Sequence, residues 1–172
     1  MREMEIYGVS FDLVGKQPIV LLKTSGGNKF LPIWIGHSEA AAILVKLQNA
    51  TVARPMTHDL LSDMLGQLEA EVVAVTVTEL RENTFYARIT LQQNGAEIEI
   101  DSRPSDAIAL AVRSDAKIYA ADEVIEESGI EFEGEGGEGE EVAGVTPLAD
   151  LDPDEFRQFL DSVSPDEFRA ED

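Results

Sequence analysis

Charged residues that could do chemistry gather where one predicted strand runs without a linker into a predicted helix. This junction carries Asp101, Arg103, Ser105 and Asp106. A helix start leaves backbone N–H donors unpaired, and these donors attract anions. An arginine placed there can hold a phosphate through two parallel hydrogen bonds. The junction therefore favours a site for an anionic ligand, although Arg103 and Asp106, three residues apart, can also form a plain salt bridge.

A second charged stretch, from Arg54 to Asp59, begins another predicted helix. Thr57 is predicted as its N-cap, and Asp59 in the first turn complements the helix dipole. His58 can change charge near neutral pH and so act as a general base or acid, but the stretch can equally be an ordinary capped helix start. The apolar residues that follow have helical spacing and predict one buried face: Leu60, Leu61, Met64, Leu65 and Leu68.

The elements that must position these residues form two predicted copies of one unit, over residues 4–68 and 71–130. Each copy is predicted as β-β-β-α, a short extended piece and a further helix. The stretch from Ser38 matches the stretch from Ser105 at an offset of 105 − 38 = 67, and the same offset maps residues 51–53 onto 118–120. One offset through several elements predicts an internal duplication. Hairpins within each copy and a helix between copies predict an α+β fold with a mixed sheet.

Length and charge divide the chain into a body and an acidic tail. At 172 residues the chain suits one domain with an appendage. Residues 1–121 carry a net charge of −4 and residues 122–172 one of −17, so the body lacks the broad basic face of a typical nucleic-acid-binding protein. We expect a domain over residues 1–130, a disordered Glu/Gly-rich linker over 131–149 and short helices over 150–172.

The sequence also bears on where the protein works. It contains no cysteine, which is typical of proteins that do not rely on disulfides. Its N-terminus does not resemble a secretory signal, and no apolar run reaches the length needed to cross a bilayer. We therefore expect a cytoplasmic protein with no membrane partner.

Four blocks of the sequence resemble the bifunctional nuclease domain family. In chain order they are Leu31–Gly36 with Ser38–Ala40, Arg54–Leu60, Asn83–Ala87 and Ser102–Ala107. The resemblance spans about residues 4–130, and the end of the chain, Phe159–Phe168, is similar to the tails of actinobacterial members. The resemblance implies a mixed α+β domain that forms a homodimer and cleaves both DNA and RNA.

Cleavage of a phosphodiester needs a group that stabilises charge on the phosphoryl oxygens, a base that activates water and an acid for the leaving oxygen. The residues predicted to be catalytic are Arg54, His58, Asp59, Asp101, Arg103 and Asp106. The residues predicted to bind substrate carry hydroxyls at helix starts: Ser38, Thr57 and Ser105. The candidate ligands for a Mg²⁺ or Mn²⁺ ion are Glu39, Asp101 and Asp106. The expected substrate is single-stranded or flexible nucleic acid, bound weakly.

None of these spacings is specific on its own. The sequence has no two-histidine metal helix, no P-loop and no paired-carboxylate signature of a two-metal nuclease. Two other functions stay open at this point: a non-catalytic regulatory module, and a protein that binds a nucleotide or another single phosphate at the same helix starts. The low basic content of the body favours these two alternatives, and the family resemblance favours the nuclease.

Overall fold

One mixed β-sheet and four helices make up the part of the chain that the computed structural model describes, residues 1–11 and 17–131. The strands are β1 (Arg2–Phe11), β2 (Pro18–Thr24), β3 (Lys29–Trp34), β4 (Ala70–Arg81), β5 (Thr84–Gln93), β6 (Ala96–Ser102), β7 (Lys117–Ala120) and β8 (Ile130–Glu131). The helices are α1 (His37–Leu47), α2 (Thr57–Gln67), α3 (Pro104–Ser114) and α4 (Asp122–Ser128). Apart from Glu131, the predicted linker and the predicted C-terminal helices lie outside the described residues.

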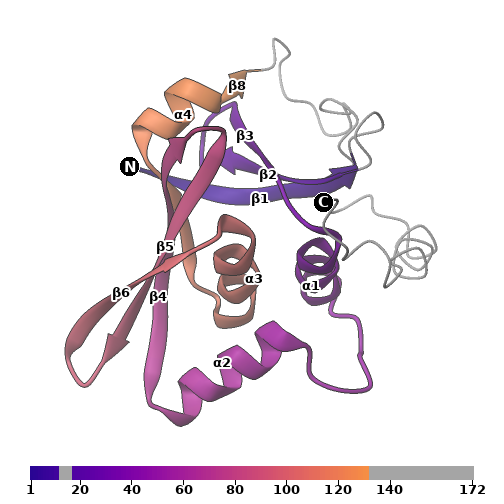
Figure 1. Ribbon diagram of the computed structural model, residues 1–172, viewed down its shortest axis with the longest axis vertical. Helices are drawn as coiled ribbons and strands as arrows, with labels where there is room; N and C mark the ends of the chain where they lie inside the picture. The colour runs from indigo at the N-terminus through magenta and orange to yellow at the C-terminus, as the bar shows by residue number, and fades with distance from the viewer. Residues whose placement is uncertain (12–16, 132–172) are drawn as a thin grey trace.

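The sheet runs in the order β6-β5-β4-β7-β1-β2-β3-β8 (Figure 1). β4 and β7 are parallel, and all the other neighbouring strands are antiparallel. The parallel pair forms because α3 carries the chain from β6 at the edge of the sheet back to its middle, as a crossover requires. This mixed sheet with its separate helices confirms the predicted α+β class.

Helix α3 lies at the centre of the helical layer and contacts α1, α2, β4 and β5 (Figure 1). Its sequence explains how one helix can have so many neighbours. Seven of its residues are buried: Pro104, Ser105, Ala107, Ile108, Ala109, Leu110 and Ala111. The small alanine side chains let neighbouring backbones come close, and a helix that is apolar on most sides belongs inside a core.

The two halves of the described chain share the order β-β-β-α. Helices α1 and α3 cover residues 37–47 and 104–114, and β3 and β6 begin at residues 29 and 96, so the predicted offset of 67 relates these bounds. The correspondence fails at residues 51–53, which form no strand, whereas their counterparts at 118–120 lie in β7. The internal duplication itself stays a prediction.

Helix α2 differs from its sequence-based prediction in two ways. It begins at Thr57, with Met56 at the N-cap position, so Thr57 is not the cap. Its predicted buried face is also wrong, because His58 is its only buried residue. The side chains of four apolar residues are exposed, to 56% for Leu60, 37% for Leu61, 53% for Met64 and 61% for Leu68.

The exposure follows from how α2 is placed. Within the described residues α2 packs mainly against α3 and β4, and nothing covers its outer side. No helix in this part of the chain is long and apolar enough to cross a membrane.

Candidate active site

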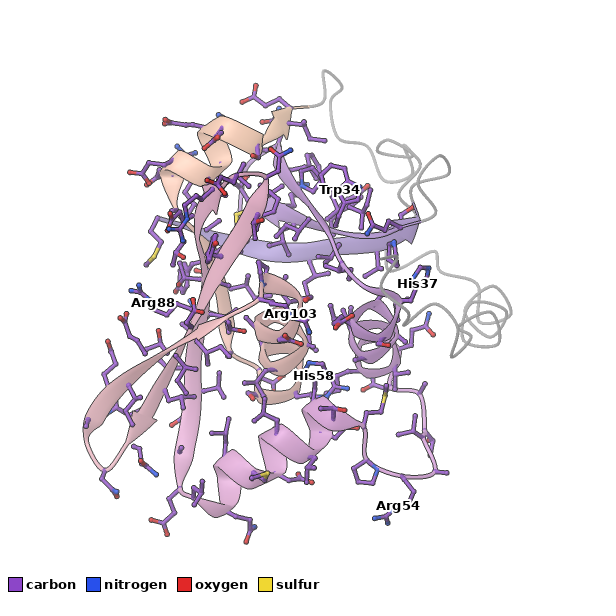
Figure 2. The ribbon with its side chains drawn as sticks, viewed as in Figure 1. Trp34, His37, Arg54, His58, Arg88 and Arg103 are labelled. Carbon is purple, nitrogen blue, oxygen red and sulfur yellow. The ribbon has the colours of Figure 1, made fainter. Side chains whose placement is uncertain are left out.

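The first turns of three helices meet at one cluster of charged side chains. Arg103, the N-cap residue of α3, contacts Glu39 in the first turn of α1 and Asp106 in its own helix. Asp106 in turn contacts His58, the second residue of α2. Figure 2 shows Arg103 and His58 close together at the middle of the molecule. We call Glu39, Arg103, Asp106 and His58 the helix-start cluster.

Arg103 uses one side of its guanidinium to hold two carboxylates. Its Nε donates to Oδ2 of Asp106 at 2.7 Å, and its Nη2 donates to Oδ1 of Asp106 at 3.1 Å and to Oε1 of Glu39 at 2.7 Å. Because a guanidinium has five N–H donors, both N–H groups of Nη1 remain without a partner among the described residues. The Arg103 side chain is 66% exposed, so these two donors can meet a ligand from solvent.

Gly36, directly before α1, lies against the carboxylate of Glu39. A β-carbon added at Gly36 would overlap Oε2 of Glu39, so a side chain at this position would displace the carboxylate from its place over the helix start. The Glu39 side chain is 16% exposed. Gly36 therefore belongs to the structure of the cluster, although it carries no chemistry itself.

His58 is held in one tautomer by Asp106. The distance from Nε2 of His58 to Oδ1 of Asp106 is 3.0 Å. Burial raises the pKa of Asp106, but hydrogen bonds from Arg103 and His58 outweigh it and hold that pKa below its ordinary value. An ionised carboxylate only accepts hydrogen bonds, so Nε2 of His58 carries the hydrogen and Nδ1 of a neutral His58 keeps its lone pair. The His58 side chain is 11% exposed.

The cluster carries no net positive charge. The hydrogen bond to Asp106 raises the pKa of Arg103, as does the bond to Glu39, so the guanidinium stays charged. With Glu39 and Asp106 ionised and His58 neutral, the formal charges sum to −1, and protonation of His58 brings the sum to zero. Such a cluster can orient a phosphate but does not attract a polyanion over a long distance.

A second ion pair lies one residue further along α2. Nε of Arg113 donates to Oδ1 of Asp59 at 2.6 Å, while the Met56 N–H donates to Oδ2 of Asp59 at 2.7 Å. Burial raises the pKa of Asp59, but these hydrogen bonds and the Arg113 charge lower it by more, so the net shift of the pKa is downward. Two neighbouring residues, His58 and Asp59, thus tie the start of α2 to both ends of α3.

The structure does not bring every predicted site residue to the helix-start cluster. Arg54 is exposed in the loop between α1 and α2 and points away from the cluster (Figure 2). Asp101 pairs in register with Arg88, whereas its neighbour Ile100 pairs with the buried Ile89. Since side chains alternate along a strand, Asp101 lies on the sheet face opposite the helices.

The predicted substrate-binding hydroxyls lie in the first turns of the three helices. Ser38 is half-buried in α1, Thr57 is exposed in α2, and Ser105 in α3 is 7% exposed. Asp59 lies next to His58 in sequence, but its carboxylate is directed to Arg113.

The predicted metal ligands do not fit a divalent cation as they stand. Glu39 and Asp106 do come together, but the guanidinium of Arg103 lies between their carboxylates, and Asp101 is on the other face of the sheet. Residues 1–11 and 17–131 contain no group of three or more histidine, cysteine or acidic side chains that could hold a metal ion. Arg103 is the cation that bridges these two carboxylates.

Comparison with known proteins identifies the family. Residues 20–133 match the bifunctional nuclease domain. An uncharacterized protein of Mycobacterium tuberculosis is 37% identical over 170 residues, which cover 99% of both chains. Bifunctional nuclease 1 of Oryza sativa subsp. japonica and bifunctional nuclease 2 of Arabidopsis thaliana are each 32% identical over 98 residues, 55% of this chain and 30% of the plant protein. The chain belongs to the bifunctional nuclease domain family, which confirms the resemblance seen in its sequence.

Sequence reasoning missed two residues that shape this region. Arg113 lies 54 residues from its partner Asp59, and no local pattern signals that pair. Gly36 was visible only as the end of a strand, but its position three residues before an acidic first-turn residue is a signal that could have drawn attention to it.

Proposed function

We propose that this protein hydrolyses phosphodiester bonds in DNA and RNA, and that the helix-start cluster is its active site. The observation that carries the proposal is the continuous chain of contacts from Glu39 through Arg103 and Asp106 to His58. In this chain of contacts the carboxylate of Asp106 binds both Arg103, which can stabilise negative charge, and His58, whose tautomer it fixes. Membership of the bifunctional nuclease domain family and the similarity to the plant nucleases support the reaction.

In this proposal Arg103 stabilises the charge that develops on the phosphoryl oxygens. Its two Nη1 donors have no partner among the described residues, while Glu39 and Asp106 fix the guanidinium plane. Because the donors are held in place before the substrate arrives, they cost little reorganisation during the reaction. Arginine suits this role better than lysine, whose ammonium cannot hold two carboxylates and a phosphate in one plane.

His58 acts in this proposal as the general base. Asp106 accepts the hydrogen of Nε2, which leaves Nδ1 to take a proton from the attacking water. The carboxylate also stabilises the imidazolium that forms, as in other Asp–His pairs. Since the imidazole is largely buried, only a small molecule such as water reaches it, and the substrate strand itself stays outside.

The charge of the cluster and of the whole chain favours a weakly bound substrate. The cluster sums to −1 with neutral His58, and the chain carries −21. Neither provides the steering that a rigid duplex with regularly spaced phosphates would require. A single-stranded or flexible segment can present one phosphate to Arg103 without bringing its neighbours against the acidic surface.

A cleavage assay with matched arginine variants tests the proposal. Wild type, Arg103→Ala, Arg103→Lys and Arg88→Ala are purified identically and given single-stranded DNA and RNA, with and without magnesium or manganese. Arg88 is the control because it too is exposed and ion-paired, to Glu99, but lies outside the cluster. We expect Arg103→Ala to lose about 10²–10³ in rate, Arg103→Lys to be impaired as well, and Arg88→Ala to match wild type.

A wild-type rate for folded Arg103→Ala would overturn the assignment to this cluster. Circular dichroism of each variant shows whether a lost rate reflects unfolding.

The hydrogen bonds that Arg103 already makes favour a second function. Its two donors without a partner among the described residues both belong to one nitrogen, Nη1, so Arg103 suits contact with one phosphate group better than contact with several phosphates of a strand. The alternative is a non-catalytic module that binds a nucleotide or another single phosphate at the same place. The dependence of affinity on salt separates the two: a strand that neutralises several charges loses affinity steeply with salt, and a single phosphate loses it slowly.

We also propose that the protein forms a homodimer through the exposed face of α2. Leu60, Met64 and Leu68 follow each other at four-residue spacing and form one apolar stripe, which is 53–61% exposed. Burying each of these side chains against a second copy would contribute roughly 1.5–3 kcal/mol. Sedimentation analysis of Met64→Lys against Ile130→Lys, an exposed apolar residue of β8, tests this. Dissociation by Met64→Lys alone is expected, and a wild-type monomer would contradict the proposal.

A further inference from the structure

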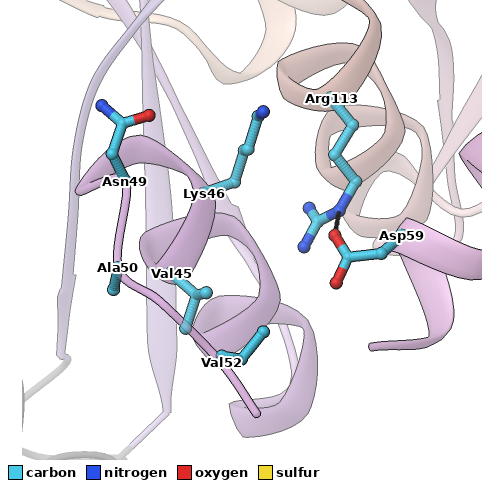
Figure 3. Close-up of a pocket in the computed structure, with 7 residues that line it drawn as sticks. All are labelled: Val45, Lys46, Asn49, Ala50, Val52, Asp59 and Arg113. Carbon is cyan, nitrogen blue, oxygen red and sulfur yellow. Dashed lines mark hydrogen bonds and ion pairs between the residues drawn. The ribbon is translucent and has the colours of Figure 1, made fainter. Parts of the chain in front are cut away.

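A pocket of about 230 Å³ opens at the C-terminal end of α3, opposite the end that carries Arg103, between the end of α1 and the start of α2. Figure 3 shows the residues that line it: Val45, Lys46, Asn49, Ala50, Val52, Asp59 and Arg113. Its volume exceeds the roughly 10–15 Å³ that one water needs, but it lies below the roughly 300–1,000 Å³ of pockets that take drug-sized ligands. The pocket therefore suits a small ligand and not a whole nucleoside.

Arg113 is a buried cation whose donors are only partly used. Its side chain is 3% exposed, its Nε donates to Asp59, and its Nη1 donates to the Ala109 carbonyl at 2.8 Å. Nη2 has no hydrogen-bond partner among the described residues. Yet the described chain contains no fully enclosed side-chain nitrogen that lacks a partner. The Nη2 end of the guanidinium must therefore be reachable, and the pocket is what it lines.

Two further polar side chains join Arg113 at this pocket. Lys46 lies in the last turn of α1 and forms no ion pair within residues 1–11 and 17–131. Asn49 follows with a left-handed backbone, φ 51°, and its amide has no partner there. Asp59 adds a negative charge, but Oδ1 already accepts from Arg113 and Oδ2 from the Met56 N–H. Lys46 and Arg113 together leave the pocket with one net positive charge.

We propose that this pocket binds a phosphate group, at a site separate from the helix-start cluster. Arg113 and Lys46 both line this space and can supply charged donors to it, and Asn49, which also lines it, can supply a neutral amide donor. A buried, partly unsatisfied guanidinium gains most from an anion because its own solvation is already lost. The phosphate is either free phosphate or a phosphate in the backbone of a nucleic-acid strand.

Titration of the ¹⁵N-labelled full chain with inorganic phosphate tests the site directly. Amide shifts are followed at constant ionic strength in wild type, Lys46→Gln, Lys46→Arg and Lys117→Gln. Lys46 is exposed, so its variants fold, whereas Arg113 is too buried to be a clean target. Lys117, an exposed lysine paired with Glu3, is the control.

Saturable shifts in residues 46–50 and at Arg113 are expected in wild type. Lys46→Gln should weaken phosphate binding about 10-fold, the cost of one charge-assisted contact. Lys46→Arg should restore most of it, and Lys117→Gln should bind as wild type does. An absence of saturable shifts, shifts centred on residues 103–106, or equal affinity in Lys46→Gln would overturn the proposal.

Competition separates the two sources of phosphate. If an oligonucleotide with non-hydrolysable linkages displaces inorganic phosphate, the site takes a backbone phosphate; if it does not, the site takes a free one. Because binding is read without any cleavage, the result is independent of the proposed nuclease activity.

Discussion

Arg103 and Arg113 both hold carboxylates, but their surroundings give them different roles. The Arg103 side chain is 66% exposed, and two of its donors have no partner among the described residues, whereas the Arg113 side chain is 3% exposed. Breaking a pair that contains a buried charge costs more than breaking an exposed one, because the remaining charge loses its partner where water cannot replace it. We therefore propose that Arg103 contacts the substrate, and that Arg113 fixes α2 on α3 while its Nη2 remains able to bind a phosphate in the pocket.

The pH dependence of stability should report the Asp59–Arg113 pair. The pKa of Asp59 lies below its ordinary value of 3.8, so the ionised form stabilises the folded state above that pH, and this contribution is lost as pH falls through the lower folded value. Asp59→Asn should cost on the order of 1–3 kcal/mol at neutral pH, and its deficit against wild type should shrink as pH drops below about 3.8.

Chemical denaturation of both proteins at several pH values measures this effect. The matched control is Asp63→Asn, because Asp63 is exposed on the same helix and forms no ion pair among the described residues. This control should stay within about 0.5 kcal/mol of wild type. A pH-independent deficit in Asp59→Asn would show that the pair does not act through its charge.

At the scale of residues the sequence predicted the types of side chain better than their partners. Arg103, Asp106 and His58 were named from helix-start chemistry, and the structure brings them together. Asp101 was named for the same reason, but the alternation of strand β6 turns it to the opposite face. Which face Asp101 occupies depends on the register of β6 with β5, and a local pattern of charges does not predict that register.

At the scale of elements, the helix-start cluster depends on the space at Gly36, the residue directly before α1. Gly36→Ala should push the Glu39 carboxylate away from Arg103, because the new β-carbon takes the space of Oε2. We expect roughly a 10-fold loss in cleavage rate, the cost of one charge-assisted hydrogen bond, with little change in the overall fold.

Gly66→Ala is the matched control for that substitution. A β-carbon at Gly66 meets nothing within 4 Å, so alanine in helix α2 should stabilise the protein by about 0.5–1 kcal/mol and leave the rate unchanged. Equal cleavage rates for Gly36→Ala and wild type would show that Glu39 does not help to position Arg103.

The order of elements was easier to predict than their burial. The Asn94-Gly95 turn adopts positive φ at both residues, 50° and 79°, as a two-residue hairpin requires, and Pro104 occupies the first position of α3. The apolar spacing of α2 predicted a helix correctly but a buried face wrongly. Periodicity shows which residues share a face, and only the neighbouring elements decide whether that face is covered.

At the scale of the whole molecule, the acidic tail should be separable from the body. The described core lies within residues 1–131, and residues 132–172 carry 14 acidic and two basic residues, a net of −12 of the chain's −21. Deleting 132–172 should leave the melting temperature nearly unchanged and strengthen the binding of single-stranded oligonucleotides at low salt, because less like charge opposes them.

Fluorescence anisotropy at low and high salt, with calorimetry on the same samples, measures both effects. The difference in affinity should vanish at high salt, where charges are screened. A large fall in melting temperature would instead show that the tail forms part of the folded core.

The sheet order was not accessible from the sequence. β7 lies between β4 and β1, so two strands far apart in the chain flank it. The predicted hairpins explain the pairs β1–β2, β2–β3, β4–β5 and β5–β6, which are local. The long-range pairs depend on how α3 packs. That packing is decided by the contacts of α3 with helices and strands from the whole chain, and no local stretch of sequence contains them.

The central claim is that Arg103 and His58 act on phosphodiesters as one unit through Asp106. The most direct test is the single-turnover cleavage rate of wild type, Arg103→Ala, His58→Ala and the double variant, purified identically and confirmed as folded. If the cluster is a unit, each single variant loses about 10²–10³ in rate, and the double variant loses little more than the worse single one. If both folded single variants cleave at the wild-type rate, with and without magnesium or manganese, the helix-start cluster is not the active site.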